Sequence, residues 1–244
     1  MRKTLFKSVY QIDTISPIDS WNTFKVYLLD RKLSSSHYFV DGSRVSFEKV
    51  GSVLLKSASL ACYIEDEYFE FLHGVVRNNQ YCFVYIKSKQ HIDLDWEPLV
   101  FALKDQGVLI SAWVDDSEYA FWQNAEDPLQ YRAAGRRYEG LPMKSNGLPF
   151  PVERQIIDIS GNPGRWLHRS GYVEAVASRM WFGDSFWELT GSNPVAIKQL
   201  ESIENGLSRL VVQDSCFSSA TGDEGAKQNE LRALLYPSVG QMDA

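Results

Sequence analysis

Apolar and polar residues alternate along the first stretch of the chain. Residues 5–15 (LFKSVYQIDTI) follow this period-two pattern, which is typical of a β-strand. Ser16 and Pro17 then predict the start of a helix, with Ser16 at the N-cap and Pro17 in the first helical position, reaching about Leu33. A strand followed by a helix is therefore the first expected unit.

The next hundred or so residues are dominated by short apolar runs that favour strands. Residues 37–50 are ambiguous, with an extended run at 38–40 and a turn signal at Asp41-Gly42. The clear runs predict three antiparallel strands at 60–64, 68–72 and 81–86, a helix from 95 to about 104, a buried strand at 108–114 and its partner strand at 119–122.

The last third of the chain contains its most distinctive stretch, with four large aromatic residues between Trp181 and Trp187. Such a segment must be buried, because fully burying each large apolar side chain is worth about 1.5–3 kcal/mol. The pattern predicts helices at 172–182, 193–203 and 227–235 and a strand at 207–212. Residues 135–164 hold four prolines and predict a long ordered loop, which is a common place for functional surfaces.

These elements predict an α+β protein with an antiparallel-rich sheet lobe followed by a mainly helical C-terminal lobe. The expected divisions are an α/β sheet lobe at 1–134, a Pro/Gly-rich connector at 135–171 packed on the body, and the helical lobe at 172–244. We expect Trp181 to lie in the core of that last lobe.

Composition narrows the class of protein. Apolar residues make up 44% and charged residues 23% of the chain, which are ordinary values for a globular protein. Cys62, Cys82 and Cys216 are widely spaced, so we expect free thiols rather than a zinc site. No signal-peptide core and no run of eighteen apolar residues is present, which favours a cytoplasmic protein that does not enter a membrane.

Charge is unevenly distributed along the chain. The net charge of −6 argues against nonspecific nucleic-acid binding. Residues 60–130 contain 13 acidic and 4 basic residues, whereas 131–172 contain 7 basic and 3 acidic residues. The acidic part concentrates in turns, and the candidate partner-binding residues there are Glu65, Asp66, Glu67, Glu70, Asp115, Asp116 and Glu118.

Three interpretations of these acidic turns remain open. Turns are commonly polar, so the acids could serve solubility alone. They could instead form one negative face that attracts a basic protein partner. Hard cations also prefer carboxylates, but no D-x-D-x-D-G pattern is present, so we predict no metal ligand.

We find no catalytic motif and predict neither a catalytic residue nor a cofactor. Residues 158–165 (DISGNPGR) lack the lysine of a phosphate-binding loop and fit a tight turn better, with Arg165 bracing it against carbonyls or an acid. One alternative is a small-molecule or phosphate-binding enzyme that uses the basic 132–169 loop. Its anion site would be formed by Arg136, Arg137, Arg165, His168 and Arg169.

A resemblance adds to this picture. Residues 146–149 (NGLP), 158–165, 172–176 (YVEAV) and 180–187 (MWFGDSFW) resemble bacterial toxin-immunity proteins, including those paired with type VI secretion effectors. The resemblance covers about the last 110 residues. It implies a cytoplasmic inhibitor, without enzymatic activity, that binds a cognate secreted toxin such as a nuclease. A nuclease must hold phosphates with Lys and Arg, so an acidic surface on its inhibitor would suit it. A scaffold or adaptor is a third possible class.

Overall fold

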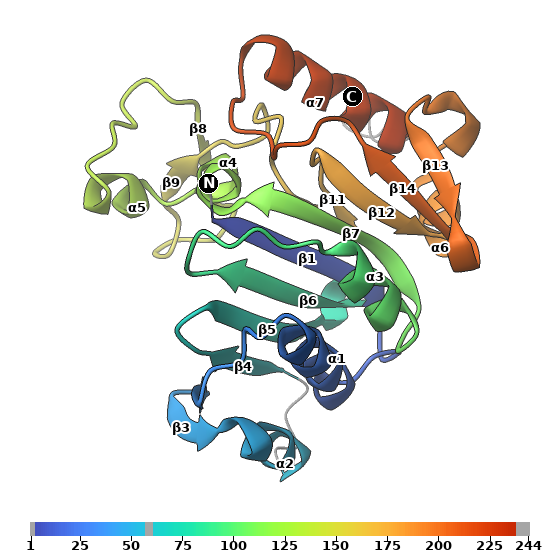
Figure 1. Ribbon diagram of the computed structural model, residues 1–244. Helices are drawn as coiled ribbons and strands as arrows, with labels where there is room; N and C mark the ends of the chain where they lie inside the picture. Colours follow the sequence, from blue (N-terminus) through green and yellow to red (C-terminus); the bar gives the residue numbers. More distant parts are fainter. Residues whose placement is uncertain (1–2, 57–60, 238–244) are drawn as a thin grey trace.

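One antiparallel sheet runs through the whole protein (Figure 1). The structure is a computed structural model that describes residues 3–56 and 61–237. Within these residues ten strands form the sheet, and every neighbouring pair in it is antiparallel. In spatial order they are β13 (Leu200–Ile203), β14 (Leu207–Val211), β12 (Arg179–Gly183), β7 (Leu109–Asp116), β1 (Thr4–Gln11), β6 (Tyr81–Ser88), β5 (Phe69–Val76), β4 (Cys62–Glu65), β2 (His37–Val40) and β3 (Ser43–Ser46).

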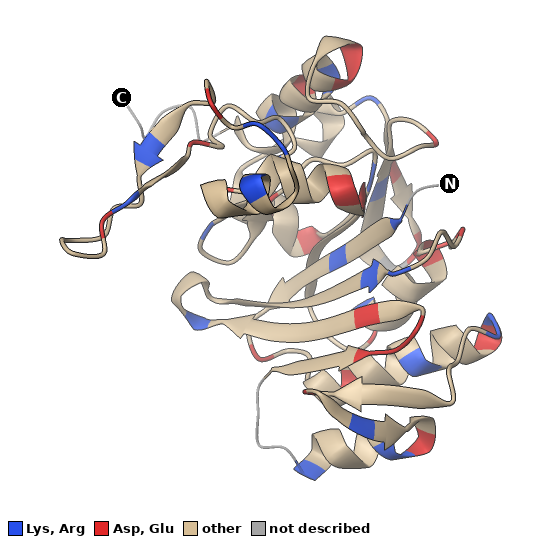
Figure 2. Ribbon diagram, turned by 90° about the vertical axis from the view of Figure 1, so that its left-hand side faces the viewer, with Lys and Arg blue, Asp and Glu red and all other residues tan. Residues whose placement is uncertain are grey.

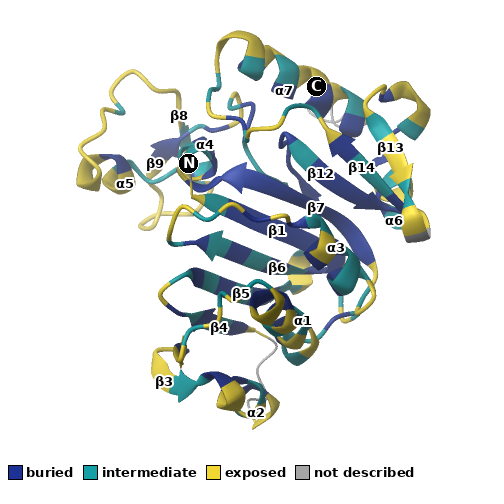
Figure 3. Ribbon diagram, in the orientation of Figure 1, coloured by how far each residue is buried: buried dark blue, intermediate teal, exposed yellow. Residues whose placement is uncertain are grey.

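The first strand of the chain lies in the interior of this sheet. β1 pairs with β6 on one side and with β7 on the other. Its side chains are buried on both faces, with Phe6 and Tyr10 packed in one core cluster and Val9 in another. The predicted strand is thus confirmed as far as Gln11, whereas residues 12–15 turn away from the sheet. Its interior position explains why polar residues in it such as Lys7 are also buried (Figure 3).

Three helices cover one face of the sheet. They are α1 (Pro17–Asp30), α2 (Val50–Lys56) and α3 (Glu97–Lys104). The predicted start of α1 is confirmed, because the Ser16 side chain accepts a hydrogen bond from the Asp19 amide at 3.2 Å. Aromatic pairs fill the interface, including Trp21 against Phe71 at 5.5 Å between ring centroids.

A second core lies on the opposite face, over β12 and β7. It is formed by α6 (Asp184–Thr190), α7 (Gly222–Leu235) and the segment from Val173 to Ala177.

The predicted turn at residues 158–165 is held by hydrogen bonds within the turn. Asp158 accepts from the Ser160 amide at 3.0 Å, and Arg165 donates to the Asn162 carbonyl at 2.7 Å. This contact of Arg165 confirms its expected bracing role.

The remaining elements are short. The helices are α4 (Ser117–Asn124) and α5 (Pro128–Ala133), and the strands are β8 (Met143–Ser145) with β9 (Gln155–Ile157), and β10 (Leu167–His168) with β11 (Val173–Glu174). Single 3-10 turns are η1 (Phe47–Lys49), η2 (Arg77–Asn79), η3 (Pro194–Ala196) and η4 (Glu204–Gly206).

Three predicted elements are wrong. Residues 119–122 belong to helix α4, because the Asp116 carboxylate caps the amides of Glu118 and Tyr119 and starts a helix there. Residues 172–182 contain β11 and β12 instead of a helix, since β12 is buried between β7 and β14. Residues 193–203 form η3 and then β13.

The predicted α+β class is confirmed, but the predicted order of lobes is not. Residues after 172 contribute β12, β13 and β14 to the sheet as well as α6 and α7. Trp181 is buried, as expected, but it lies in the core cluster that also contains α1 and α3. The predicted strand at 60–64 begins at Cys62, and Leu60 lies outside the described residues.

Candidate interaction surface

Strand register brings the two acidic turns to the same end of the sheet. Asp116 at the end of β7 pairs with Thr4 at the start of β1. Phe69 at the start of β5 pairs with Ser88 at the end of β6. Because β1 and β6 separate β7 from β5, the turns lie about 14 Å apart at about 4.8 Å per strand.

The first turn, between β4 and β5, uses one of its acids for its own structure. Asp66 is buried and accepts hydrogen bonds from the amides of Tyr68 at 2.8 Å and Phe69 at 2.6 Å. Burial raises the pKa of this carboxyl above its usual range. Asp66 therefore shapes the turn, whereas Glu67 beside it is exposed.

The other two acids of this turn lie in ion pairs at the surface. Glu65 binds the Lys89 ammonium at 2.5 Å, and the hydrogen bond from that ammonium lowers the pKa of the carboxyl. Glu70 lies 3.6 Å from Lys87, its cross-strand neighbour. Both carboxylates are half-buried, so their charges still reach solvent.

The second turn, between β7 and α4, is divided in the same way. Asp115 and Asp116 are buried, and Asp116 is the N-cap of α4. Glu118 is exposed and accepts a hydrogen bond from Arg136 at 2.9 Å. Of the seven predicted acids, four therefore reach the surface: Glu65, Glu67, Glu70 and Glu118. Figure 2 shows acidic and basic residues interspersed along the ribbon.

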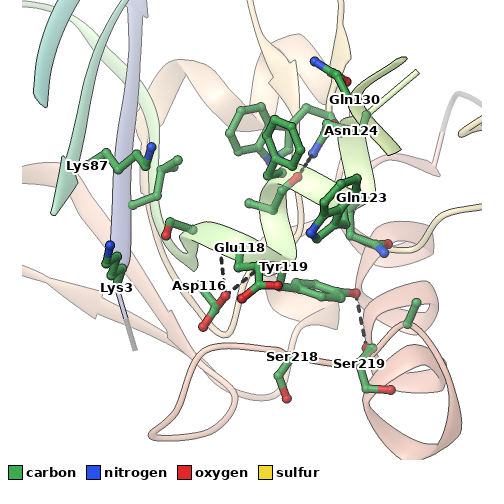
Figure 4. Close-up of a pocket in the computed structure, with 18 of the residues that line it drawn as sticks. Lys3, Lys87, Asp116, Glu118, Tyr119, Gln123, Asn124, Gln130, Ser218 and Ser219 are labelled. Carbon is green, nitrogen blue, oxygen red and sulfur yellow. Dashed lines mark hydrogen bonds between the residues drawn. The ribbon is translucent and has the colours of Figure 1, made fainter. Parts of the chain in front are cut away.

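A groove of about 1070 Å³ runs beside α4, close to this end of the sheet (Figure 4). Lys3 and Lys87 line one side of it, and Ser218 and Ser219 line the other. The Tyr119 hydroxyl at its floor donates to the Ser219 carbonyl at 3.2 Å and to Gln228 at 2.9 Å. These bonds tie α4 to α7 and keep the groove in shape.

The sheet face next to this groove carries aromatic side chains. Tyr63, Leu72 and Tyr85 are neighbours across β4, β5 and β6, because Leu72 pairs with both tyrosines. They alternate with residues such as Phe71 that pack under the helices, so they point to the opposite face, where they are half-buried. Tyr85 also lines the groove, so the two features are continuous.

Sequence reasoning missed these three residues. A usable signal was the period-two alternation within each predicted strand, in which Tyr63 flanks Ile64 and Tyr85 flanks Ile86. The two lysines of the groove were also missed, because Lys3 directly precedes β1 and Lys87 lies in β6, far away in sequence.

A buried charged pair lies beneath the wall of the groove. The Lys7 ammonium sits over the rings of Trp166 at 4.5 Å and Phe83 at 5.0 Å. Burial lowers the pKa of Lys7 to about 8 and raises the pKa of the neighbouring Asp115 carboxyl to about 7. Trp166 also lines the groove, so the Lys7 ammonium lies directly beside one of the groove's wall residues.

Four of the five basic residues of the alternative enzyme hypothesis bind groups of the protein itself. Arg165 binds the Asn162 carbonyl, and Arg169 binds the buried Glu174 at 2.5 Å. His168 shares a hydrogen bond with the Tyr81 hydroxyl, Arg136 binds Glu118, and Arg137 is exposed. These five residues therefore do not form the anion site that the hypothesis requires.

Neither a metal site nor a membrane span stands out in the parts of the chain that the structure describes. No three His, Cys, Asp or Glu side chains there are grouped to hold a metal ion. No helix there is long and apolar enough to cross a membrane. Cys62 and Cys82 are buried free thiols, and Cys216 is half-buried.

Comparison with known proteins returned no relative: no protein-family model, curated protein or solved structure matches the chain. The resemblance to immunity proteins rests on the sequence motifs quoted above.

Proposed function

We propose that this protein is an immunity protein that binds and neutralises a cognate secreted bacterial toxin, acting in the cytoplasm. The contact surface is the end of the sheet that carries the two acidic turns. The observation that carries the proposal is the register of β7, β1, β6 and β5, which brings the exposed carboxylates of Glu67 and Glu118 to one end of the sheet. A nuclease toxin would present a basic active site there, since phosphate contacts come from Lys and Arg.

The ion pairs of this surface are exposed, so basic residues of a toxin can take the place of their internal basic partners. Pairs such as Glu118 with Arg136 lie in water, where an ion pair contributes about 0–1 kcal/mol. A toxin lysine or arginine can therefore replace the internal partner at little cost. Charges at the rim mainly raise the association rate, so binding should weaken as salt increases.

The aromatic sheet face supplies the apolar part of the contact. Tyr63 and Tyr85 offer large side chains that lose little conformational freedom on binding. They lie beside the acidic turns, which corresponds to the apolar centre and polar rim of protein interfaces.

The direct test is binding to a catalytically inactive form of the toxin encoded beside this gene, measured by interferometry. Glu67→Lys and Glu118→Lys together are expected to lower the association rate at low salt by about 10-fold or more. Glu188→Lys is the matched control, because Glu188 is exposed on α6, which follows β12 at the other end of the sheet.

Two outcomes would contradict the proposal in different ways. If the wild-type protein does not bind the adjacent toxin, the immunity function is wrong. If binding is intact and the double reversal behaves like Glu188→Lys, the acidic surface is not the contact.

A further inference from the structure

The hairpin β8–β9 ends in an uncharged tip, residues 146–152 (NGLPFPV), which we call the hairpin tip. Phe150 is 90% exposed there, and its neighbours Leu148 and Val152 are 52% and 56% exposed. A single exposed apolar residue is ordinary, but three within five residues on a projecting loop form a patch. Figure 2 shows the hairpin standing out from the body at the left of the view.

The hairpin tip is held in one conformation by the side chain of Asn146. Its carbonyl oxygen accepts hydrogen bonds from the amides of Leu148 and Arg154, both at 3.2 Å. Its amide nitrogen donates to the Val152 carbonyl at 3.1 Å, and the Val152 amide donates to the Pro149 carbonyl at 3.0 Å. These hydrogen bonds fix the shape of the loop, so Phe150 is presented outward on a frame that needs little ordering on binding.

The base of the hairpin is anchored beside the proposed contact surface. Lys144 binds Glu126 at 3.0 Å, and the Ile157 amide donates to the Glu126 carbonyl at 2.9 Å. Ile157 packs with Ala125, which directly follows α4 and lines the groove. The base of the hairpin therefore lies next to the groove, and the hairpin tip projects from there.

We propose that the hairpin tip inserts the Phe150 ring into an apolar pocket of the toxin, and that carboxylates border this pocket. This inference rests on the proposed immunity function. Arg154 is exposed next to the hairpin tip, just before β9 begins, and it has only a loose pair with Asp127 at 3.7 Å. It can pair with an acidic group at the border of the pocket, because its side chain takes no part in shaping the tip.

Charge also distinguishes a protein pocket from an anionic membrane. The exposed carboxylate of Glu153 directly follows the hairpin tip, and the whole chain carries a net charge of −6. An anionic lipid surface would repel this carboxylate, whereas a folded pocket can place its own charges to avoid it.

The test measures affinity for the immobilised, catalytically inactive product of the adjacent toxin gene. Phe150→Ala is expected to weaken binding about 30-fold or more, as for a central aromatic anchor. Asn146→Ala keeps the ring but loosens its frame, and should weaken binding about 3- to 10-fold. Arg154→Glu should weaken it more at low salt than at high salt.

Val195→Ala is the matched control, because Val195 is 89% exposed on η3, outside the proposed surface. It should leave affinity unchanged, and all four variants should keep the wild-type thermal unfolding midpoint or lie close to it. Measured in the same experiment, the midpoint separates a lost contact from a lost fold.

The inference is overturned if wild type binds and Phe150→Ala binds equally well, which leaves the immunity function standing. It is overturned together with that function if wild type does not bind the toxin. It is also overturned if Phe150 instead mediates sedimentation with phosphatidylserine vesicles, or a wild-type dimer that Phe150→Ala dissociates.

Discussion

The indole nitrogen of Trp181 donates a hydrogen bond of 3.0 Å to the carboxylate of Glu97. Trp181 lies in β12 and Glu97 is the first residue of α3, so the bond joins the C-terminal part of the sheet to a helix from the first half of the chain. Arg209 of β14 binds the same carboxylate at 2.9 Å. The distinctive aromatic stretch is thus part of the framework that unites the chain.

Trp181→Ala is expected to lower the free energy of unfolding by about 3–5 kcal/mol, because it leaves a large cavity in the core. Leu189→Ala is the control, since Leu189 is partly exposed nearby on α6 and should change stability by less than about 1 kcal/mol. Urea unfolding measures both. Equal effects of the two substitutions would contradict the assignment of Trp181 to the core.

A buried ion pair should be sensitive to the loss of one partner. Glu174 is 1% exposed and lies 3.5 Å from Arg232, which also donates to the Arg165 carbonyl at 2.7 Å. Arg232→Met should lower the free energy of unfolding by about 3 kcal/mol, because it removes these bonds and leaves Glu174 with less compensation. Glu174→Gln should lower the free energy of unfolding by less in the Arg232→Met background than in the wild-type background. Strict additivity in urea unfolding would show that the two residues are not coupled.

Acid should destabilise the protein through His73. This residue of β5 is fully buried against Ser20, 3.0 Å away, and burial lowers its pKa to about 4. The unfolded chain binds a proton near pH 6.5, so the stability that neutral His73 contributes is present above that pH and is lost as pH falls toward 4. The wild-type free energy of unfolding should therefore decrease more between pH 6.5 and 4 than that of His73→Leu. Parallel curves for the two proteins would rule this out.

The contribution of Asp115 to the pH dependence of stability should have the opposite sign. Burial raises its pKa from 3.8 to about 7, so the folded state holds a proton that the unfolded chain releases. Its contribution is present below pH 3.8 and is lost as pH rises through about 7. Denaturant titrations from pH 4 to 8 should show wild type losing stability relative to Asp115→Asn, and a constant difference between them would be the contrary result.

The sequence predicted elements whose signals are local. Ser16 and Pro17 start α1 because a cap needs only its own neighbouring amides, and the strands at 62–65, 69–76 and 81–88 follow clear apolar runs. Asn193 likewise caps the short turn η3 by accepting a hydrogen bond from the Val195 amide at 3.0 Å.

The wrong elements depend on tertiary packing. Residues 172–182 have few polar side chains beyond Glu174, Ser178 and Arg179, so periodicity cannot separate a buried helix from a buried strand. β12 is a strand because β7 and β14 hydrogen-bond to it on both sides. Gly183 allows its close crossing, since a Cβ there would lie 2.0 Å from the Leu109 carbonyl oxygen.

The candidate surface was predictable in its location along the chain but not in its composition. Acidic turns are visible in sequence, but the burial of a particular acid in a turn is not. Asp66 and Asp116 are buried while their carboxylates cap nearby amides, and an exposed acid in a turn can cap amides in the same way. The pairing of Glu70 with Lys87 depends on strand register. Sequence reasoning did not single out Phe150, because its exposure becomes visible only once the loop has a shape.

The order of strands in the sheet has a consequence for biosynthesis. β7 is complete when residue 116 leaves the ribosome, but β12, which pairs with its outer edge, starts only at residue 179. During this interval a nascent chain carries an unpaired edge on a strand whose every residue is buried in the finished protein. Trp113 also lacks the later residues, such as Phe182, that share its core cluster. Chaperone capture or aggregation should therefore be concentrated at this stage of translation, and a transcript truncated before β12 would yield a chain with that edge left open.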